Sequence, residues 1–210
     1  MAPGEKVCIT GIGASGKTTL VNLLMGMYEP DAGFVAYNGV TYGNIDPISL
    51  RGYIGACLSQ KYLFRGTIRE NLDMGFEHVT LDKVLYALEL VGLTRYVQSL
   101  PKGLDTEIVP ESIQIPQTIS RKLIVARCLV IEPRLLVLDE SFGTWDRPDQ
   151  EHMLSLLTET LPATVIAISN DRSYAAKCHK IIIMEQGEIK EIGSYEEIAD
   201  RPYFNDCFFG

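Results

Sequence analysis

The sequence of 210 residues contains no apolar run that approaches the ~18 residues needed to cross a membrane. Its first residues also lack the apolar segment and cleavage site of a secretory signal peptide. Basic residues are outnumbered, because 19 lysines and arginines stand against 27 acidic residues and the net charge is −8. Since the phosphate backbone attracts basic surfaces, we expect no nucleic acid among the partners.

Cysteines are few and dispersed, with no C-x-x-C pair that would indicate a zinc site or a redox centre. An odd number also argues against a disulfide framework, so reduced thiols are expected. Most of them are expected to be small buried apolar side chains. The five residues are Cys8, Cys57, Cys128, Cys178 and Cys207.

Short apolar runs alternate with segments of helical spacing, which predicts an α/β fold with a parallel sheet covered by helices. The chain shows no linker, so we expect one domain over residues 1–210 with a helical insert at about residues 80–131. Asn38-Gly39 and Gln186-Gly187 are hairpin signals. The expected strands are residues 6–10, 53–58, 135–138, 164–168 and 181–184, and the expected helices are residues 17–27, 81–91, 119–131 and 150–160.

A phosphate-binding loop is predicted directly after the first strand and before the first helix. The segment reads G-I-G-A-S-G-K-T and fits G-x-x-x-x-G-K-[ST]. Glycines allow several N–H groups to face one anion, Lys17 supplies a charge for the β- and γ-phosphates, and the Thr18 hydroxyl can bind Mg²⁺. The expected nucleotide-binding residues are Gly11, Gly13, Ala14, Ser15, Gly16, Lys17, Thr18 and Thr19.

An acidic pair follows the apolar strand at residues 135–138. A carboxylate at the end of a buried strand can lie beside the metal, so Asp139 is a predicted Mg²⁺ ligand through water. The next carboxylate, Glu140, can polarise the attacking water and is a predicted catalytic residue.

Several further segments, taken with this loop, resemble the nucleotide-binding domains of exporter-type ATP-binding cassette (ABC) transporters. Residues 58–72 resemble the Q-loop and the stretch after it, and residues 100–106 resemble the segment before the signature motif. Residues 138–146 resemble the Walker B strand followed by the D-loop, which here contains Trp145. The resemblance covers nearly the whole chain, and its motifs occur in family order.

This resemblance implies an ATPase that works as a head-to-tail dimer with a second nucleotide-binding domain. It also implies a transmembrane exporter domain as partner and a position at the cytoplasmic face of the membrane. Gln60 would contact Mg²⁺ or the attacking water, so it is both a predicted metal ligand and a predicted catalytic residue. The implied cofactors are ATP and Mg²⁺.

The signature motif departs from the family pattern. The family's L-S-G-G-Q falls on I-P-Q-T-I, residues 115–119, with no glycine and with Pro116 in place of the serine. Proline has no N–H to offer a phosphate, and Gln117 and Thr118 add bulk where the backbone should approach. We therefore expect a poor surface for ATP across the dimer and weak or partner-dependent hydrolysis.

The switch position is the second departure. Asn170 stands where the family usually has a histidine, and it is predicted to act catalytically in that place. It can donate a hydrogen bond, but it does not titrate near neutral pH. The three histidines, His78, His152 and His179, do not fall in this register and are expected to be solvated or in the core.

Only ten residues precede Gly11. The resemblance implies earlier strands and an aromatic residue that stacks on adenine, so we expect a domain that is truncated at its N-terminus.

Three alternatives belong to other classes of protein. An ATP-binding regulatory or structural cassette with little turnover would also fit the altered signature. A small kinase or GTPase would not explain the series of motifs from Gln60 to Asp139, and the guanine-reading N-K-x-D motif is absent. A DNA-repair member of the ABC family would need a long coiled coil for which the spacing leaves no room.

Overall fold

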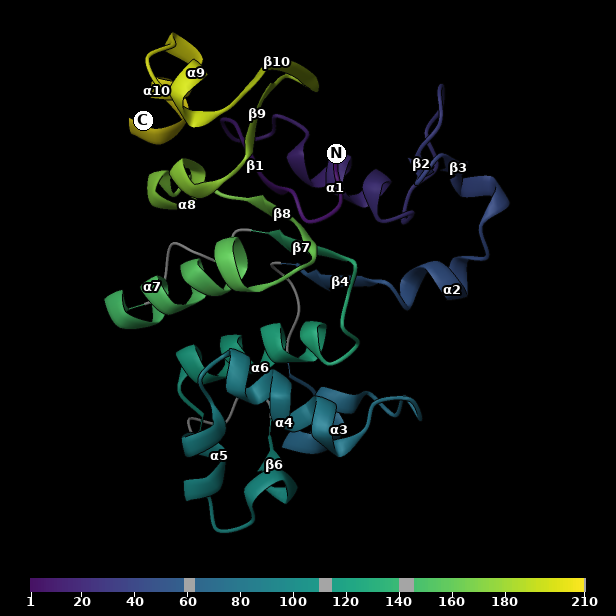
Figure 1. Ribbon diagram of the computed structural model, residues 1–210, viewed down its shortest axis with the longest axis vertical. Coiled ribbons are helices and arrows are strands. Elements are labelled where there is room, and N and C mark those ends of the chain that lie inside the picture. The colour runs from purple at the N-terminus through teal and green to yellow at the C-terminus, as the bar shows by residue number, and fades with distance from the viewer. Residues whose placement is uncertain (59–62, 110–114, 140–145, 210) are drawn as a thin grey trace.

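The central feature is a six-stranded sheet in the order β10-β9-β1-β8-β7-β4. The computed structural model describes residues 1–58, 63–109, 115–139 and 146–209 (Figure 1). All neighbouring strands are parallel except β10, which runs antiparallel to β9 at one edge. The strands are β1 (Lys6–Thr10), β4 (Ile54–Cys57), β7 (Leu135–Asp139), β8 (Thr164–Ile168), β9 (Lys180–Glu185) and β10 (Glu188–Gly193).

Both faces of the sheet are covered, which explains why its inner strands are continuous apolar runs. Val7 and Ile9 of β1 belong to one apolar cluster with Val21 of α1 (Lys17–Leu24). Cys8, between them, belongs to the second and larger cluster on the other face. This face is covered by α7 (Arg147–Ser155), the π-helical turn Leu156–Thr160 and α8 (Arg172–Lys177).

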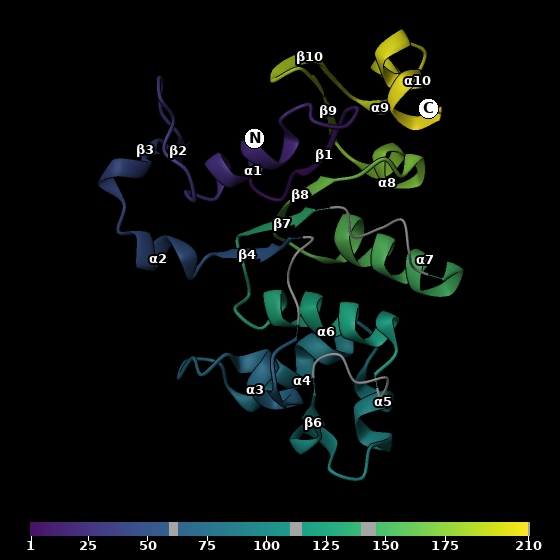
Figure 2. The same ribbon diagram turned by 180° about the vertical axis from the view of Figure 1, so that it is seen from behind.

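A group of helices lies beyond the β4 side of the sheet. They are α3 (Ile68–Asp73), α4 (Leu81–Leu90), α5 (Thr94–Ser99) and α6 (Gln117–Leu129). Figures 1 and 2 show α3, α4 and α5 on the far side of α6 from the sheet, so α6 joins this group to the sheet. The short strands β5 (Gly66–Thr67) and β6 (Glu107–Ile108) pair within it, and the 3-10 turn η2 (Gly103–Asp105) lies near them.

A small hairpin follows α1. It consists of β2 (Ala36–Tyr37) and β3 (Val40–Thr41) and leads into the 3-10 turn η1 (Tyr42–Asn44) and α2 (Pro47–Arg51). Asn38 and Gly39 take φ values of 50° and 82°, the left-handed pair that a tight hairpin turn requires. The Asn38-Gly39 hairpin predicted from the sequence is therefore confirmed.

The remaining predictions of local structure hold with shifted ends. The predicted helix at residues 17–27 ends at Leu24, because Gly26 has a φ of 66° and ends the helical path. The predicted helix at residues 150–160 begins earlier, at Arg147 with Pro148 in the first turn, and its last part is the π-helical turn. Four of the five cysteines are buried and all are free.

The C-terminal helices α9 (Tyr195–Ile198) and α10 (Pro202–Phe209) fold back beside the β9–β10 edge (Figure 1). Phe204 of α10 is fully buried and packs edge-on against Tyr195 of α9. Among the described residues, no helix combines the length and apolar character needed to span a bilayer.

Candidate functional site

The loop between β1 and α1 leaves the sheet at Gly11. This residue has a φ of 153°, and a Cβ atom added to it would lie 2.1 Å from the carbonyl oxygen of Met184 on β9. Glycine is therefore required both by the backbone conformation and by the close approach of the neighbouring strand. At the outer part of the loop, Gly13 and Ala14 are exposed, and Ala14 adopts a left-handed φ of 61°.

The second half of the loop is braced by the β9–β10 turn. The N–H of Gly187 in that turn donates to the carbonyl oxygen of buried Ser15 at 3.1 Å. Gly16 caps α1 in a left-handed conformation, φ 92°, and an added Cβ would lie 3.3 Å from the Cα of Gly187. The loop is thus held between its own helix and a turn more than a hundred residues away in sequence.

Lys17 begins α1 and points back over the loop. Its Nζ donates to the carbonyl oxygens of Gly11 and Ile12 at 2.6 and 3.1 Å and to Ser15 Oγ at 2.9 Å. Thr18 and Thr19, the next two residues, are exposed. The N-terminus of α1 has neither a side-chain cap nor an acidic residue in its first turn. Its N–H groups and the lysine charge therefore favour an anion at this place.

Strand register brings the acidic residue to the same edge of the sheet. Ile168 on β8 lies opposite Ile9 on β1 and opposite Asp139 on β7, so the three strands end at one level. Asp139 is only 6% exposed. The structure therefore places the Asp139 carboxylate and the loop at the same edge of the sheet, with β8 between the two strands that carry them.

Asn170 follows the end of β8 and is exposed at this edge. Its Oδ1 accepts a hydrogen bond from Thr10 Oγ1 at 2.8 Å. The next residue, Asp171, caps α8 by accepting from the N–H groups of Ser173 and Tyr174 at 2.7 and 3.2 Å. The Asn170 side chain is thus fixed to β1, while its backbone leads directly into a capped helix.

Two residues of this site were missed by the sequence analysis. Thr10 could have been noticed as the polar residue at the end of an otherwise apolar strand. Cys207 on α10 carried no signal, because only the tertiary fold brings it near. Burial raises the pKa of its thiol, while a hydrogen bond with Thr10 and the charge of Lys17 act in the opposite direction. The C-terminal helix therefore contributes a thiol beside the loop.

Residues 115–119, where the resemblance puts the signature motif, lie at the start of α6. The helix begins at Gln117, and Pro116 takes the N-cap position without any side-chain cap. Pro116 and Gln117 are exposed, while Ile115, Thr118 and Ile119 are half-buried. Gln60, Glu140 and Trp145 lie outside the described residues, so the loop, Asp139 and Asn170 are the predicted site residues that the structure places together.

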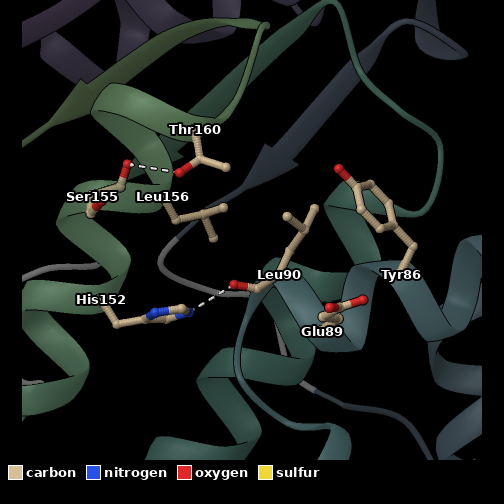
Figure 3. A pocket seen from close by; sticks show the side chains of 7 residues that line it. All are labelled: Tyr86, Glu89, Leu90, His152, Ser155, Leu156 and Thr160. Atoms are coloured by element: carbon tan, nitrogen blue, oxygen red, sulfur yellow. Dashed lines mark hydrogen bonds between the residues drawn. The ribbon is translucent and has the colours of Figure 1, made fainter.

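The histidines occupy other places in the fold. His179 Nδ1 accepts a hydrogen bond from the backbone N–H of Lys6 at 3.0 Å, and the His78 ring tilts against Phe76 with centroids 5.4 Å apart. His152 Nε2 lies 2.8 Å from the carbonyl oxygen of Leu90 (Figure 3). None of them takes the switch position, as predicted.

A shallow pocket of about 230 Å³ separates α4 from α7 and the π-helical turn (Figure 3). Its lining residues are Tyr86, Glu89, Leu90, His152, Ser155, Leu156 and Thr160. None of these belongs to the loop or to the strand ends around it, so the pocket is distinct from the candidate anion site.

Comparisons with known proteins agree with this geometry. A family model described as ABC transporter matches residues 1–143. The chain is 32% identical over 202 residues to the transport/processing ATP-binding protein ComA of Streptococcus pneumoniae. The matched residues are 96% of this chain and 28% of ComA. It is 30% identical over 199 residues to the cyclolysin secretion/processing ATP-binding protein CyaB of Bordetella pertussis. This match covers 94% of this chain and 28% of CyaB.

A solved structure of a bacterial Atm1-family ABC exporter with ATP bound superposes with a TM-score of 0.88 at 27% identity. That match covers 96% of this chain and 36% of the exporter chain. The chain thus spans about 28% of the length of the curated relatives named above. The reading as a small kinase or GTPase is excluded, and the α/β fold with a parallel sheet and flanking helices is confirmed. The chain belongs to the ABC transporter family and is one of its ATP-binding domains.

Proposed function

We propose that this domain binds ATP together with Mg²⁺ and hydrolyses it to power export through a transmembrane domain. The observation that carries the proposal is the shared edge of the sheet, where the glycine-rich loop, Lys17 and Asp139 come together. Family relatives at about 30% identity include proteins named for transport and secretion. The domain would act at the cytoplasmic face of the membrane, with its substrate selected elsewhere in the transporter.

The residues around the loop fit a magnesium nucleotide. The Thr18 hydroxyl and the Asp139 carboxylate are oxygen donors, which Mg²⁺ prefers, and Gln60 would add a third. The described residues contain no cluster of three His, Cys, Asp or Glu side chains, so phosphate oxygens and water would complete the shell. When bound, the ion neutralises charge on the β- and γ-phosphates.

The chain's own residues then have separate tasks. Lys17 exchanges its contacts with the loop carbonyls for contacts with phosphate oxygens. The free N–H groups at the start of α1 hold the β-phosphate. Glu140 accepts a hydrogen bond from the attacking water and orients it, while Asn170 donates to the γ-phosphate in place of a histidine.

The altered signature makes hydrolysis depend on a partner. We propose that the helical insert at about residues 80–131, which contains α4 to α6, presents residues 115–119 to the second domain. Pro116 can donate no N–H, and α6 begins without a side-chain cap. In a mixed dimer, the partner would supply an intact signature to this chain's loop, while the opposite site would turn over slowly.

The test compares wild type, Glu140→Gln and Lys17→Ala in the complete transporter, with ATP hydrolysis and equilibrium ATP binding both measured. Glu140→Gln is expected to retain ATP binding and to lose hydrolysis, and Lys17→Ala is expected to lose both. Glu159→Gln, which alters an exposed carboxylate of the π-helical turn, is the matched control. Hydrolysis that is unchanged in Glu140→Gln would contradict the proposal.

The second candidate is a regulatory cassette that binds ATP and rarely hydrolyses it. Pro116 in the signature and Asn170 at the switch favour it. Tight ATP binding with no phosphate release, even beside a partner with an intact signature, would decide for this alternative.

A further inference from the structure

Thr10 is an unusual residue for its place in the sheet. It ends a strand whose other members are buried, and its own side chain is fully buried beside the central strand β8. A buried hydroxyl costs about 1–3 kcal/mol unless it is hydrogen-bonded. Its bond to Asn170 Oδ1, at 2.8 Å, is therefore the reason that a threonine is tolerated here.

The hydroxyl of Thr10 is the donor in this bond, and the side-chain carbonyl oxygen of Asn170 is the acceptor. A hydroxyl donates one proton and accepts through two lone pairs. The Asn170 carbonyl oxygen uses the one proton of Thr10, so toward any other neighbour this hydroxyl can only accept. The bond joins the end of β1 to a residue just beyond the end of β8.

This arrangement leaves the other end of the Asn170 amide available. Within the part of the chain that the structure describes, its NH₂ group has no recorded hydrogen bond, and the residue is exposed at the edge that holds the loop. An amide can present either an acceptor or two donors to a ligand. A phosphate oxygen can only accept, so it binds the NH₂ end of the amide. An amide without a fixed orientation would face the phosphate with its carbonyl oxygen for part of the time.

We propose that Thr10 is a positioning residue that binds the carbonyl end of Asn170 and so turns its NH₂ group toward the γ-phosphate of ATP. The inference rests on the proposed function, because it assigns a role toward the nucleotide of that site. Thr10 itself touches neither the nucleotide nor the reacting water. It selects one of the two orientations of the Asn170 amide, a side chain that is shorter than histidine and does not titrate.

The experiment compares Thr10→Val, Thr10→Ser and Asn170→Ala, and the double variant Thr10→Val/Asn170→Ala, in the complete transporter. Valine keeps the shape of threonine and removes the hydroxyl, while serine restores it. ATP and ADP affinities are measured at equilibrium in a Glu140→Gln background, and kcat is measured in the wild-type background. ADP is the internal control, because it lacks the γ-phosphate.

We expect Thr10→Val to weaken ATP binding about tenfold, the size of one hydrogen bond to a charged group. The affinity for ADP should stay within about twofold, and kcat should fall as well. Thr10→Ser should restore both quantities, and Thr10→Val should have no further effect when Asn170 is already alanine.

Three results would overturn the inference. They are an equal loss of ATP and ADP affinity, a loss that serine does not restore, and a loss that persists in the Asn170→Ala background. A different result would contradict the proposed function, namely that Glu140→Gln leaves the rate of ATP hydrolysis unchanged. The ratio of ATP to ADP affinity still tests Thr10 in that case, because it requires binding alone.

Discussion

Arg127 on α6 donates two hydrogen bonds to Asn71 on α3, from Nε to the backbone carbonyl oxygen and from Nη2 to Oδ1, each at 2.7 Å. Asn71 is fully buried, and its NH₂ group donates to the carbonyl oxygens of Phe64 and Thr67 at 2.9 and 3.0 Å. The guanidinium also lies 5.4 Å from the ring centroid of Phe64. The segment from Phe64 to Asn71 is thereby fastened to α6.

Arg127→Lys should destabilise the domain. Lysine cannot reproduce the two parallel donors, and it would leave an acceptor of buried Asn71 without a partner. We expect a loss of about 2 kcal/mol in the free energy of unfolding, measured by urea denaturation. Arg95→Lys on α5, where the arginine is exposed, is the control and should change stability by less than about 0.5 kcal/mol. Equal effects of the two variants would contradict the assignment.

The loop glycines offer a paired test. An added Cβ at Gly11 would lie 2.1 Å from the Met184 carbonyl oxygen, whereas one at Gly13 would have no neighbour within 4 Å. We expect Gly11→Ala to reduce the free energy of unfolding by more than about 2 kcal/mol, because the φ of 153° and the clash both oppose it. Gly13→Ala should keep wild-type stability. Thermal unfolding of the two variants, followed by circular dichroism, measures this difference.

Asn170→His should introduce a pH dependence into hydrolysis. Asparagine does not titrate, whereas histidine has an ordinary pKa of about 6.5. We expect kcat of the variant to change between about pH 5.5 and 7.5 in a way that the wild type does not, and to exceed the wild-type kcat by about tenfold at its best pH. Steady-state phosphate release across this range is the measurement. Superimposable profiles for both proteins would show that position 170 does not act on the nucleotide.

Glu5 and Lys180 form an ion pair of 2.8 Å that links the start of β1 to β9. The hydrogen bond from Lys180 lowers the pKa of the Glu5 carboxyl below its usual 4.5. A lowered carboxyl pKa stabilises the fold above the unfolded pKa, and this contribution is lost as the pH falls through the folded pKa. The pair is partly exposed, so its contribution is below about 1 kcal/mol.

Glu5→Gln should therefore lower the melting temperature slightly at pH 7 and leave it unchanged at a pH below the folded pKa of Glu5. Melting curves between pH 3 and 7 compare the variant with wild type. A constant difference at every pH would show that the ion pair contributes no pH-dependent stability.

Local patterns predicted much of this architecture. The runs at residues 135–138 and 164–168 are apolar because their strands are covered on both faces. Asn38-Gly39 predicted a tight hairpin turn, because both residues readily adopt a positive φ. The loop was recognisable because its glycines and Lys17 lie within eight successive residues, so the whole motif is visible in the local sequence. Contacts over long separations were not visible in this way. Thr10 and Asn170 are 160 residues apart, and nothing local to Cys207 indicates that α10 folds back beside them.

The common level of β1, β8 and β7 has a consequence for tolerance to change. β8 is hydrogen-bonded on one side to the strand that carries the loop and on the other to the strand that carries Asp139. A substitution just beyond its end, at Asn170, changes one side chain and leaves both neighbouring strands in place. An inserted or deleted residue within β8 would turn every later side chain of the strand to the opposite face and would disturb its pairing with both β1 and β7. The domain can therefore accept a new residue at position 170 far more readily than a change in the length of β8.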